Sequence, residues 1–158
     1  MNCQCRDGWT CSPNLGARKC YKFIEEPKLS WSDASKKCQE IAPRNQYPEF
    51  PIIRRHLASI GNGYENSFVV ELTGGVKAWL GGTRLADGNW SWTDGTKWNY
   101  TNWRQEPIKE PNNYRGQENS LVLWWPGGSV WNDASYSNKY SYVCQYLDLN
   151  QFDSLNNK

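Results

Sequence analysis

The sequence predicts a single α+β domain that disulfide bonds help to hold together. Two segments carry apolar residues at helical spacing, while several short runs rich in aromatic and β-branched residues are typical of strands. A chain of 158 residues has room for one hydrophobic core, and its six cysteines indicate an oxidising compartment. We therefore expect a secreted protein, and because no signal peptide is visible we read Met1 as the start of a mature chain.

The charge balance and the single histidine exclude several classes of function. A net charge of +2 gives no electrostatic reason to bind nucleic acid or an anionic membrane, and no apolar run is long enough to span a bilayer. With His56 as the only histidine, neither a Ser-His-Asp nor a Cys-His catalytic arrangement is credible. Cys3 and Cys5 lack the second close pair that a zinc site needs, so we expect neither zinc nor an enzyme.

The N-terminal part of the chain predicts a hairpin, a strand and a helix. Residues 1–20 hold four cysteines and few apolar residues, which indicates a disulfide-tied hairpin within the same domain. Residues 21–24 look like a short strand. Ser30 then begins a helix, with Asp33 placed as in a capping box and Pro43 at the end. The apolar stripe of this helix consists of Trp31, Ala34, Cys38 and Ile41.

A second short helix is predicted after an irregular insertion. Three prolines mark residues 43–55 as irregular, and residues 57–60 look like the end of a strand. Asn62 and Glu65 have the spacing of a helix cap, and Gly74 with Gly75 ends the helix. Its apolar face carries Phe68, Val69 and Leu72.

The second half of the chain predicts short strands around a long irregular segment. Residues 76–80 read as a strand, and residues 81–119 are rich in Gly, Asp, Asn, Trp and Pro. A segment this long without periodicity is usually functional. Further strands are expected at residues 121–125, 130–132 and 140–144. The main domain thus spans residues 21–146, and residues 147–158 form a polar tail.

Acidic and amide side chains concentrate between residues 110 and 133 and suggest a calcium site. Calcium prefers about six to eight hard oxygen ligands, whereas magnesium needs a smaller octahedral shell and keeps its waters. Since Asn and Asp are also common in turns, an ordinary polar loop is the alternative from the residues alone. The five candidate ligands of a single calcium ion are Glu110, Asn112, Glu118, Asn132 and Asp133.

Such a site suits the binding of a sugar. Two adjacent hydroxyls of a sugar can enter the open part of the calcium shell as neutral ligands. Each hydroxyl can also donate to a carboxylate and accept from an asparagine N–H. The same five side chains would then contact ion and sugar together, so removing calcium should abolish sugar binding.

A series of short motifs occurs in a fixed order along the chain. The first of them are Gly8-Trp9, Cys20-Tyr21, Ser30-Trp31 with Ala34 and Cys38, Leu57-Ala58-Ser59-Ile60 and Trp79-Leu80-Gly81-Gly82. The later ones are Gly88, Trp90, Trp92, Asp94-Gly95, Asn102-Trp103, Glu110-Pro111-Asn112, Trp131-Asn132-Asp133 and Tyr142-Val143-Cys144. In this order the motifs resemble the C-type lectin domain family over most of the chain, in an invertebrate-like, secreted, single-domain form.

The resemblance implies a fold, a sugar class and a backbone feature. The implied fold has two helices, two small antiparallel sheets and a long calcium-binding loop. In the family, Glu-Pro-Asn accompanies mannose-type sugars, so mannose, fucose, glucose or N-acetylglucosamine is expected to bind at Glu110 and Asn112. The Glu110–Pro111 bond is expected to be cis, which aims both neighbouring side chains at one ion.

The sequence also departs from the family at three places. At an auxiliary calcium site Arg84 stands where an Asp is expected, and Asn113 and Asn119 replace two more carboxylates, leaving Asp87 alone. We therefore expect one calcium ion. A common disulfide is missing, because its positions fall near Ser120 and Tyr136. The segment from residue 103 to residue 110 is about three residues longer than usual, which places Gln105, Glu106 and Lys109 near the rim.

The resemblance also implies how the cysteines pair. It predicts a Cys38–Cys144 bond and, from the Gly8-Trp9 context, a Cys5–Cys20 bond. Cys3 and Cys11 are then left over. They either bond to each other or allow one of them to reach a second chain and form a homodimer.

Two functions other than calcium-dependent sugar binding can be considered for this chain. A structural or interaction protein on the same fold, of the shell-matrix or antifreeze kind, would keep the fold landmarks with little sugar binding. Glycoside hydrolysis by paired carboxylates is disfavoured, because metal-bound carboxylates are poor general acids.

Aromatic residues near the site could stack on a sugar face, and the candidates at the rim are Trp124 and Tyr114, with Trp98 and Trp125. Trp124 and Trp125 alternate on a strand, so one of them should be core.

Overall fold

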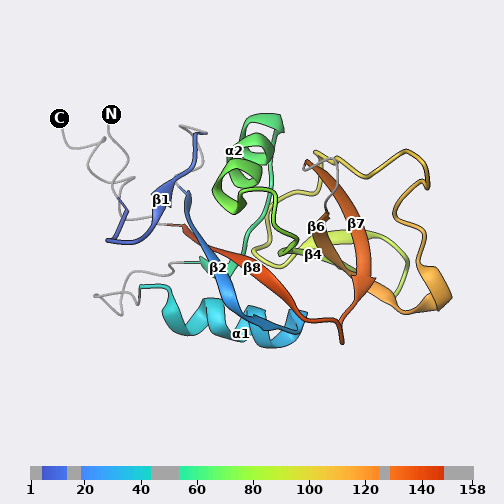
Figure 1. Ribbon diagram of the computed structural model, residues 1–158, viewed down its shortest axis with the longest axis horizontal. Coiled ribbons are helices and arrows are strands. Elements are labelled where there is room, and N and C mark those ends of the chain that lie inside the picture. The colour runs from blue at the N-terminus through green and yellow to red at the C-terminus, as the bar shows by residue number, and fades with distance from the viewer. Residues whose placement is uncertain (1–4, 14–18, 44–53, 125–128, 148–158) are drawn as a thin grey trace.

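A computed structural model describes residues 5–13, 19–43, 54–124 and 129–147 of the chain. Two helices lie on opposite sides of the strands β2 and β8, and a long loop extends from the far end of the sheet (Figure 1). The α+β class is therefore confirmed. The expected insertion at residues 43–55 lies almost wholly outside the described residues, as does the tail from residue 148 onward.

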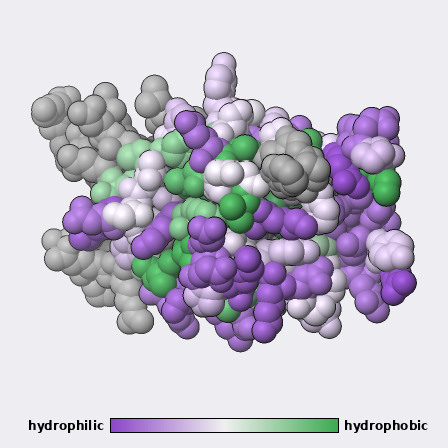
Figure 2. All heavy atoms as spheres, in the orientation of Figure 1, coloured by the Kyte–Doolittle hydropathy of each residue, from purple (hydrophilic) through white to green (hydrophobic). Residues whose placement is uncertain are grey.

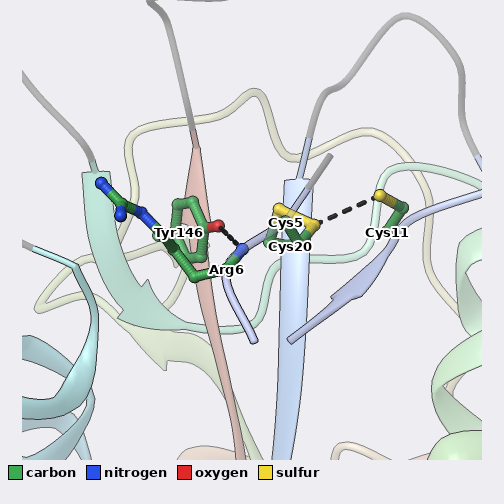
Figure 3. The surroundings of a disulfide bond; sticks show 5 residues. All are labelled: Cys5, Arg6, Cys11, Cys20 and Tyr146. Carbon is green, nitrogen blue, oxygen red and sulfur yellow. Dashed lines mark hydrogen bonds between the residues drawn. A yellow bond between two sulfur atoms is a disulfide. The ribbon is translucent and has the colours of Figure 1, made fainter. Parts of the chain in front are cut away.

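The described part of the N-terminal segment is held by strand pairing and by a disulfide. Strand β1 (Thr10–Cys11) pairs antiparallel with β2 (Lys19–Leu29), with Cys11 opposite Cys20. A Cys5–Cys20 bond ties the segment to β2, and the backbone N–H of Arg6 donates to the Tyr146 hydroxyl at 2.9 Å (Figure 3).

Cys11 completes the described part of this cysteine cluster. Its Sγ lies 3.2 Å from that of Cys5, and Cys11 is itself disulfide-bonded, so neither sulfur carries a thiol proton or serves as a metal ligand. The bond within the chain removes Cys11 from the expected alternative of a link to a second chain. Cys3 lies outside the described residues.

Helix α1 (Trp31–Ile41) forms as its sequence predicts. The Ser30 side chain accepts a hydrogen bond from the Asp33 N–H at 3.3 Å, which satisfies one of the free donors of the first turn. Ala34 and Cys38 are fully buried, and the Cys38–Cys144 disulfide fastens the helix to β8 as expected. The helix stops before Pro43, with the Ala42 N–H donating to Cys38 O.

Helix α2 (Gly63–Thr73) also has the predicted caps but buries more than an apolar face. Asn62 Oδ1 accepts from the Glu65 N–H at 2.9 Å, and Gly74 ends the helix in a left-handed conformation with φ of 61°. Val69 is buried, while Phe68 and Leu72 are only half-buried. The sequence did not reveal that Glu65 and Asn66 share the buried face.

The remaining strands form one mixed sheet, which corrects the expectation of two separate antiparallel sheets. The sheet order is β1-β2-β8-β4-β6-β7, with β3 added beside β8 and β5 beside β4. Strands β4 and β8 pair in parallel at Ala78–Ser141 and Trp79–Tyr142, and these bonds join the two antiparallel halves. The bounds are β3 (Arg54–Leu57), β4 (Ala78–Arg84), β5 (Trp90–Trp92), β6 (Glu118–Trp124), β7 (Val130–Ser135) and β8 (Tyr140–Leu147).

Strand β4 continues four residues beyond the predicted end at residue 80, because its two glycines allow close packing. A Cβ on Gly81 would lie 2.6 Å from Leu57 O, and one on Gly82 would lie 2.7 Å from Leu121 Cδ1. The irregular segment predicted at residues 81–119 is therefore shorter than expected. It contains the end of β4, all of β5 and a short 3-10 turn, η1 (Tyr114–Gly116).

The alternating side chains of β8 enter two different core clusters. Val143 belongs to the cluster that includes Val69 of α2 and the fully buried Trp131, whereas Cys144 belongs to the cluster around Trp79 and α1. The Trp131 cluster packs against several half-buried rings from the irregular segment, including Trp98 and Trp103. Aromatic packing therefore holds the start of the long loop against the sheet.

Candidate calcium and sugar site

The predicted ligands come together because the long loop is hydrogen-bonded to the start of β7. The Trp131 N–H donates to Asn102 O at 2.8 Å, and the Arg104 N–H donates to Trp131 O at 3.0 Å. Asn132 and Asp133 follow directly on β7, and β6 pairs with β7 beside them. The loop residues 110–113 are thereby placed next to Asp133. The end of the molecule that carries this loop is mostly hydrophilic (Figure 2).

Glu110 is a buried carboxylate at the base of the loop, with 4% of its surface exposed. Its backbone N–H donates to Arg104 O at 2.8 Å, which closes the longer segment into a compact turn. Its Oε1 lies 3.5 Å from Arg104 Nη2, and its Oε2 accepts from the Asn112 N–H at 3.2 Å. The Glu110–Pro111 bond is cis, as the resemblance implied.

Asp133 connects the loop to the sheet through both of its oxygens. Its Oδ1 accepts from the Asn112 N–H at 3.1 Å, and its Oδ2 accepts from the Asn113 N–H at 2.7 Å. Oδ2 is also 2.8 Å from Nη2 of Arg84, and the side chain of Asp133 is fully buried. A predicted ligand is therefore already held in place by three donors.

Asn112 and Glu118 lie on either side of a short turn, and the side chains of both accept a hydrogen bond from it. The Tyr114 N–H donates to Glu118 Oε1 at 2.8 Å and to Asn112 Oδ1 at 3.1 Å. In return, the Glu118 N–H donates to Asn113 Oδ1 at 3.1 Å. Hydrogen bonds thus connect four of the five predicted residues, and the fifth, Asn132, precedes Asp133 on β7.

Two carboxylates of this site have raised pKa values, chiefly because they are buried and lie close to a third carboxylate. Burial and the neighbouring Asp133 carboxylate raise the pKa of Glu110 to about 7, despite the opposing effects of the Asn112 N–H and Arg104. Burial also raises the pKa of Glu118, and the negative charge of Asp133 contributes in the same direction. Clustered carboxylates with raised pKa values are typical of sites built for a cation or for catalysis.

The donor set fits calcium. The buried Oδ1 of Asn132 has no hydrogen-bond partner among the described residues, which is costly for a polar atom unless a ligand satisfies it. The other candidate donors are carboxylate and amide oxygens, the hard ligands that calcium prefers. No histidine or cysteine is among them, so a softer transition metal is disfavoured.

The auxiliary cluster is arranged differently from the main site. Arg84 Nε also donates to Glu118 O at 3.4 Å, and its guanidinium carbon lies 4.8 Å from the ring centre of Trp90. Asp87 is exposed and accepts from the Asn89 N–H, and Asn119 is exposed as well. The sequence marked Arg84 as a departure but gave no sign of its ion pair with Asp133. Nothing in the sequence pointed to Arg104 as the partner of Glu110.

The two candidate rim aromatics have different surroundings. Tyr114 is 60% exposed on the turn between Asn112 and Glu118. Trp124 is half-buried and packs against the core cluster around Trp79. Lys77 Nζ lies 3.5 Å from the ring centre of Trp124, and Arg104 Cζ lies 5.9 Å from it, so only part of that ring faces outward. Tyr136 is 62% exposed and does not replace the missing disulfide near Ser120.

Comparison with known proteins agrees with the geometry. A family described as "Lectin C-type domain" matches residues 27–146. A relative named "Lectin", from Pleurodeles waltl, is 34% identical over 148 residues, which cover 90% of this chain and 76% of that protein.

Solved structures share the fold over nearly the whole chain. The C-type lectin CEL-I from Cucumaria echinata has a TM-score of 0.74 and 24% identity, covering 90% of this chain and 97% of its own. A calcium-independent type II antifreeze protein has a TM-score of 0.72 and 22% identity, covering 92% and 95%. Within the described residues, neither helix is long and apolar enough to cross a membrane.

Proposed function

We propose that this chain, which belongs to the C-type lectin domain family, is a secreted, non-catalytic lectin that binds mannose-type sugars through one calcium ion. The observation that carries the proposal is the cluster of Glu110, Glu118 and Asp133, together with the buried Oδ1 of the neighbouring Asn132, which has no hydrogen-bond partner among the described residues. Arg84 and Arg104 offset two of these three carboxylates, and a divalent cation would supply the positive charge that the third one lacks.

The ligand side chains would each have two tasks. Calcium, when bound, supplies positive charge to two adjacent sugar hydroxyls and fixes their spacing. Glu110 and Glu118 accept hydrogen bonds from these hydroxyls, while the side-chain N–H groups of Asn112 and Asn132 donate to them. The Asn112 N–H donates to both Glu110 and Asp133, which holds these two carboxylates close together.

The sugar class follows from the order of acid and amide in Glu110-Pro111-Asn112. We propose mannose, fucose, glucose and N-acetylglucosamine as ligands, because this motif accompanies them in the family. Tyr114 is the first candidate for stacking on a sugar face, since it is exposed directly beside Asn112. Trp124 is the second, through the part of its ring that Lys77 leaves open.

A second candidate function is a structural or interaction role without sugar binding. The likeness to a calcium-independent antifreeze protein favours it, because that protein uses the same fold. Only the first candidate function, sugar binding, requires the five acid and amide side chains proposed as calcium ligands. A protein that acts through another surface would tolerate the loss of Glu110.

Isothermal titration with methyl mannoside in calcium, and again in chelator, tests the proposal. We expect binding only in calcium, and expect Glu110→Gln to abolish it. Glu71→Gln, at an exposed position of α2 away from the site, is the matched control because it removes the same charge, and it should bind like the parent. Absence of binding to a panel of mannose-type and galactose-type sugars in calcium would favour the second candidate.

A further inference from the structure

The turn between Asn112 and Glu118 has an unusual backbone. Asn113, Arg115 and Gly116 have φ values of 48°, 58° and 69°, all in the left-handed region. Glycine adopts this region freely and asparagine adopts it readily, but an arginine there carries the steric cost of its Cβ. Side chains held in strained backbone positions cluster at functional sites. Arg115 is therefore the residue of this turn whose side chain needs an explanation.

The turn is fixed directly on the proposed calcium ligands. Hydrogen bonds join the Tyr114 N–H to Glu118 Oε1 and to Asn112 Oδ1, and the Gly116 N–H donates to Asn113 O at 2.8 Å. The position of Arg115 is consequently tied to the same side chains that would hold the sugar. Any group that Arg115 binds would lie at the rim of that site.

Arg115 and Tyr114 form an exposed pair of a cation and an aromatic ring. The guanidinium carbon of Arg115 lies 5.1 Å from the ring centre of Tyr114, and both side chains are exposed. A ring at this distance restricts the guanidinium and leaves its planar set of N–H donors available. The pair offers an apolar face and a charged fork side by side.

The charges of the site distinguish Arg115 from its neighbours. Arg84 is paired with Asp133 and Arg104 with Glu110, but Arg115 has no carboxylate within ion-pair distance in the described part of the chain. Residues 104–118 contain three acidic and three basic side chains, so a bound divalent ion would make the loop positive. The basic ones are Arg104, Lys109 and Arg115, and the acidic ones are Glu106, Glu110 and Glu118.

We propose that Arg115 and Tyr114 bind the anionic group of an acidic saccharide whose ring hydroxyls occupy the calcium site. This inference rests on the proposed function. The guanidinium fork would pair with two oxygens of a carboxylate or a sulfate ester, while the Tyr114 ring packs against the sugar face. The preferred ligands are then uronic acids or sulfated sugars that keep an adjacent pair of ring hydroxyls of the mannose type.

Matched pairs of saccharides test the inference. Methyl glucuronide and methyl glucoside share their ring hydroxyls and differ by the carboxylate, and 6-sulfated and plain N-acetylglucosamine differ by the sulfate ester. Titration in calcium should show one acidic member about fivefold tighter than its neutral partner, the range of a partly exposed, charge-assisted pair. High salt should reduce the preference.

Variants at residue 115 assign the effect to its side chain. Arg115→Gln should bind both members of the pair with the affinity of the neutral one, and Arg115→Lys should keep part of the preference. Arg115→Gly suits the left-handed backbone, so it serves as the charge-deficient form if the glutamine variant does not fold. Lys36→Gln on the exposed face of α1 removes the same charge elsewhere and should leave the preference intact.

The failures of the two proposals can be told apart. Equal binding of acidic and neutral partners in every pair, or a preference that survives Arg115→Gln, overturns this inference while calcium-dependent sugar binding stands. If no saccharide binds in calcium, the proposed function fails and this inference falls with it.

Discussion

Arg84 Nη2 lies 2.8 Å from Asp133 Oδ2, so an arginine of β4 neutralises a fully buried carboxylate of β7. The side chain of Arg84 is itself only 16% exposed. Removing one partner of a buried pair leaves an uncompensated charge, which is far more costly than losing a surface pair. Arg84 therefore supports a proposed calcium ligand before any ion is bound.

Arg84→Gln should destabilise the protein most strongly in chelator. We expect a loss of about 3 kcal/mol in the free energy of unfolding, since Asp133 keeps only its bonds to two backbone N–H groups. Calcium should recover part of this loss by supplying positive charge to Asp133. Urea unfolding in chelator and in calcium measures both values. Lys28→Gln, which breaks the exposed pair with Glu26, should cost less than about 1 kcal/mol in either condition.

Calcium should bind with a stoichiometry of one ion per chain. The guanidinium of Arg84 stands where a second ion would need a carboxylate, and a fixed positive charge repels a divalent cation. Equilibrium dialysis or calorimetry at saturating calcium measures the number of ions. Two ions per chain, or a second ion beside Asp87 in a calcium-soaked crystal, would contradict this expectation.

The local signals in the sequence predicted the helices better than the strands. Ser30, Asn62 and Gly74 occupy the caps they were assigned, because a cap depends on a few neighbouring residues. The predicted end of β4 was wrong, because Gly81 and Gly82 look like a turn in the sequence. They belong to the strand because Leu57 O packs closely against Gly81 and the Leu121 side chain against Gly82, which the sequence does not show. The single mixed sheet depends on parallel pairing between distant segments, which local pattern does not encode.

The residues of the candidate site could also be predicted from the sequence only in part. The acids and amides could be named because their chemistry and order along the chain are visible in Glu110-Pro111-Asn112 and in Asn132-Asp133. The partners of these residues could not. Arg84 and Arg104 are 49 and 6 residues from the carboxylates they pair with, and an arginine in a polar segment has no sequence feature that marks it as buried. The left-handed Arg115 was equally invisible, since glycine and asparagine are the residues expected there.

A buried ion pair between the hairpin and α2 should be important for stability. Lys19 Nζ lies 3.0 Å from Glu65 Oε2, both side chains are almost fully buried, and the Tyr21 hydroxyl donates to the same oxygen at 2.6 Å. Lys19→Met should lower the free energy of unfolding by about 3 kcal/mol, because Glu65 would be left buried without a cation. Denaturant unfolding measures the loss. The double variant Lys19→Met/Glu65→Gln should recover part of it, and a double variant no better than the single one would contradict the assignment.

Asp94 should make the fold sensitive to acid. Burial opposes its ionised form, but hydrogen bonds from Ser59 and from both the N–H and the hydroxyl of Thr96 outweigh burial and lower the pKa. Gln145 Nε2 donates to the same carboxylate at 2.7 Å.

The direction of the pH effect follows from that lowered pKa. Ionised Asp94 contributes its full stabilisation above the pKa that an aspartate has in the unfolded chain, about 3.9. This stabilisation is lost as the pH falls through the lower pKa of Asp94 in the folded protein. Stability measured by urea unfolding from pH 6 down to about pH 2 should therefore fall less steeply in Asp94→Asn than in the parent. Asp94→Asn should also be less stable by about 2 kcal/mol near neutral pH, because at least one donor then faces an amide. Parallel curves would show that Asp94 does not cause the acid sensitivity.

Glu110→Gln should shift stability in opposite directions with and without calcium. The pKa of Glu110, raised to about 7 by burial and by Asp133, means that its ionised form destabilises the ion-free fold at neutral pH. The glutamine variant should therefore melt at a higher temperature than the parent in chelator. In calcium at a hundred times the dissociation constant the parent gains about 2.7 kcal/mol, a gain that the variant should lack. Differential scanning calorimetry in the two buffers measures both shifts, with Glu71→Gln on the exposed face of α2 expected to follow the parent. A parent melting temperature that calcium leaves unchanged would show that Glu110, Glu118 and Asp133 do not hold the ion.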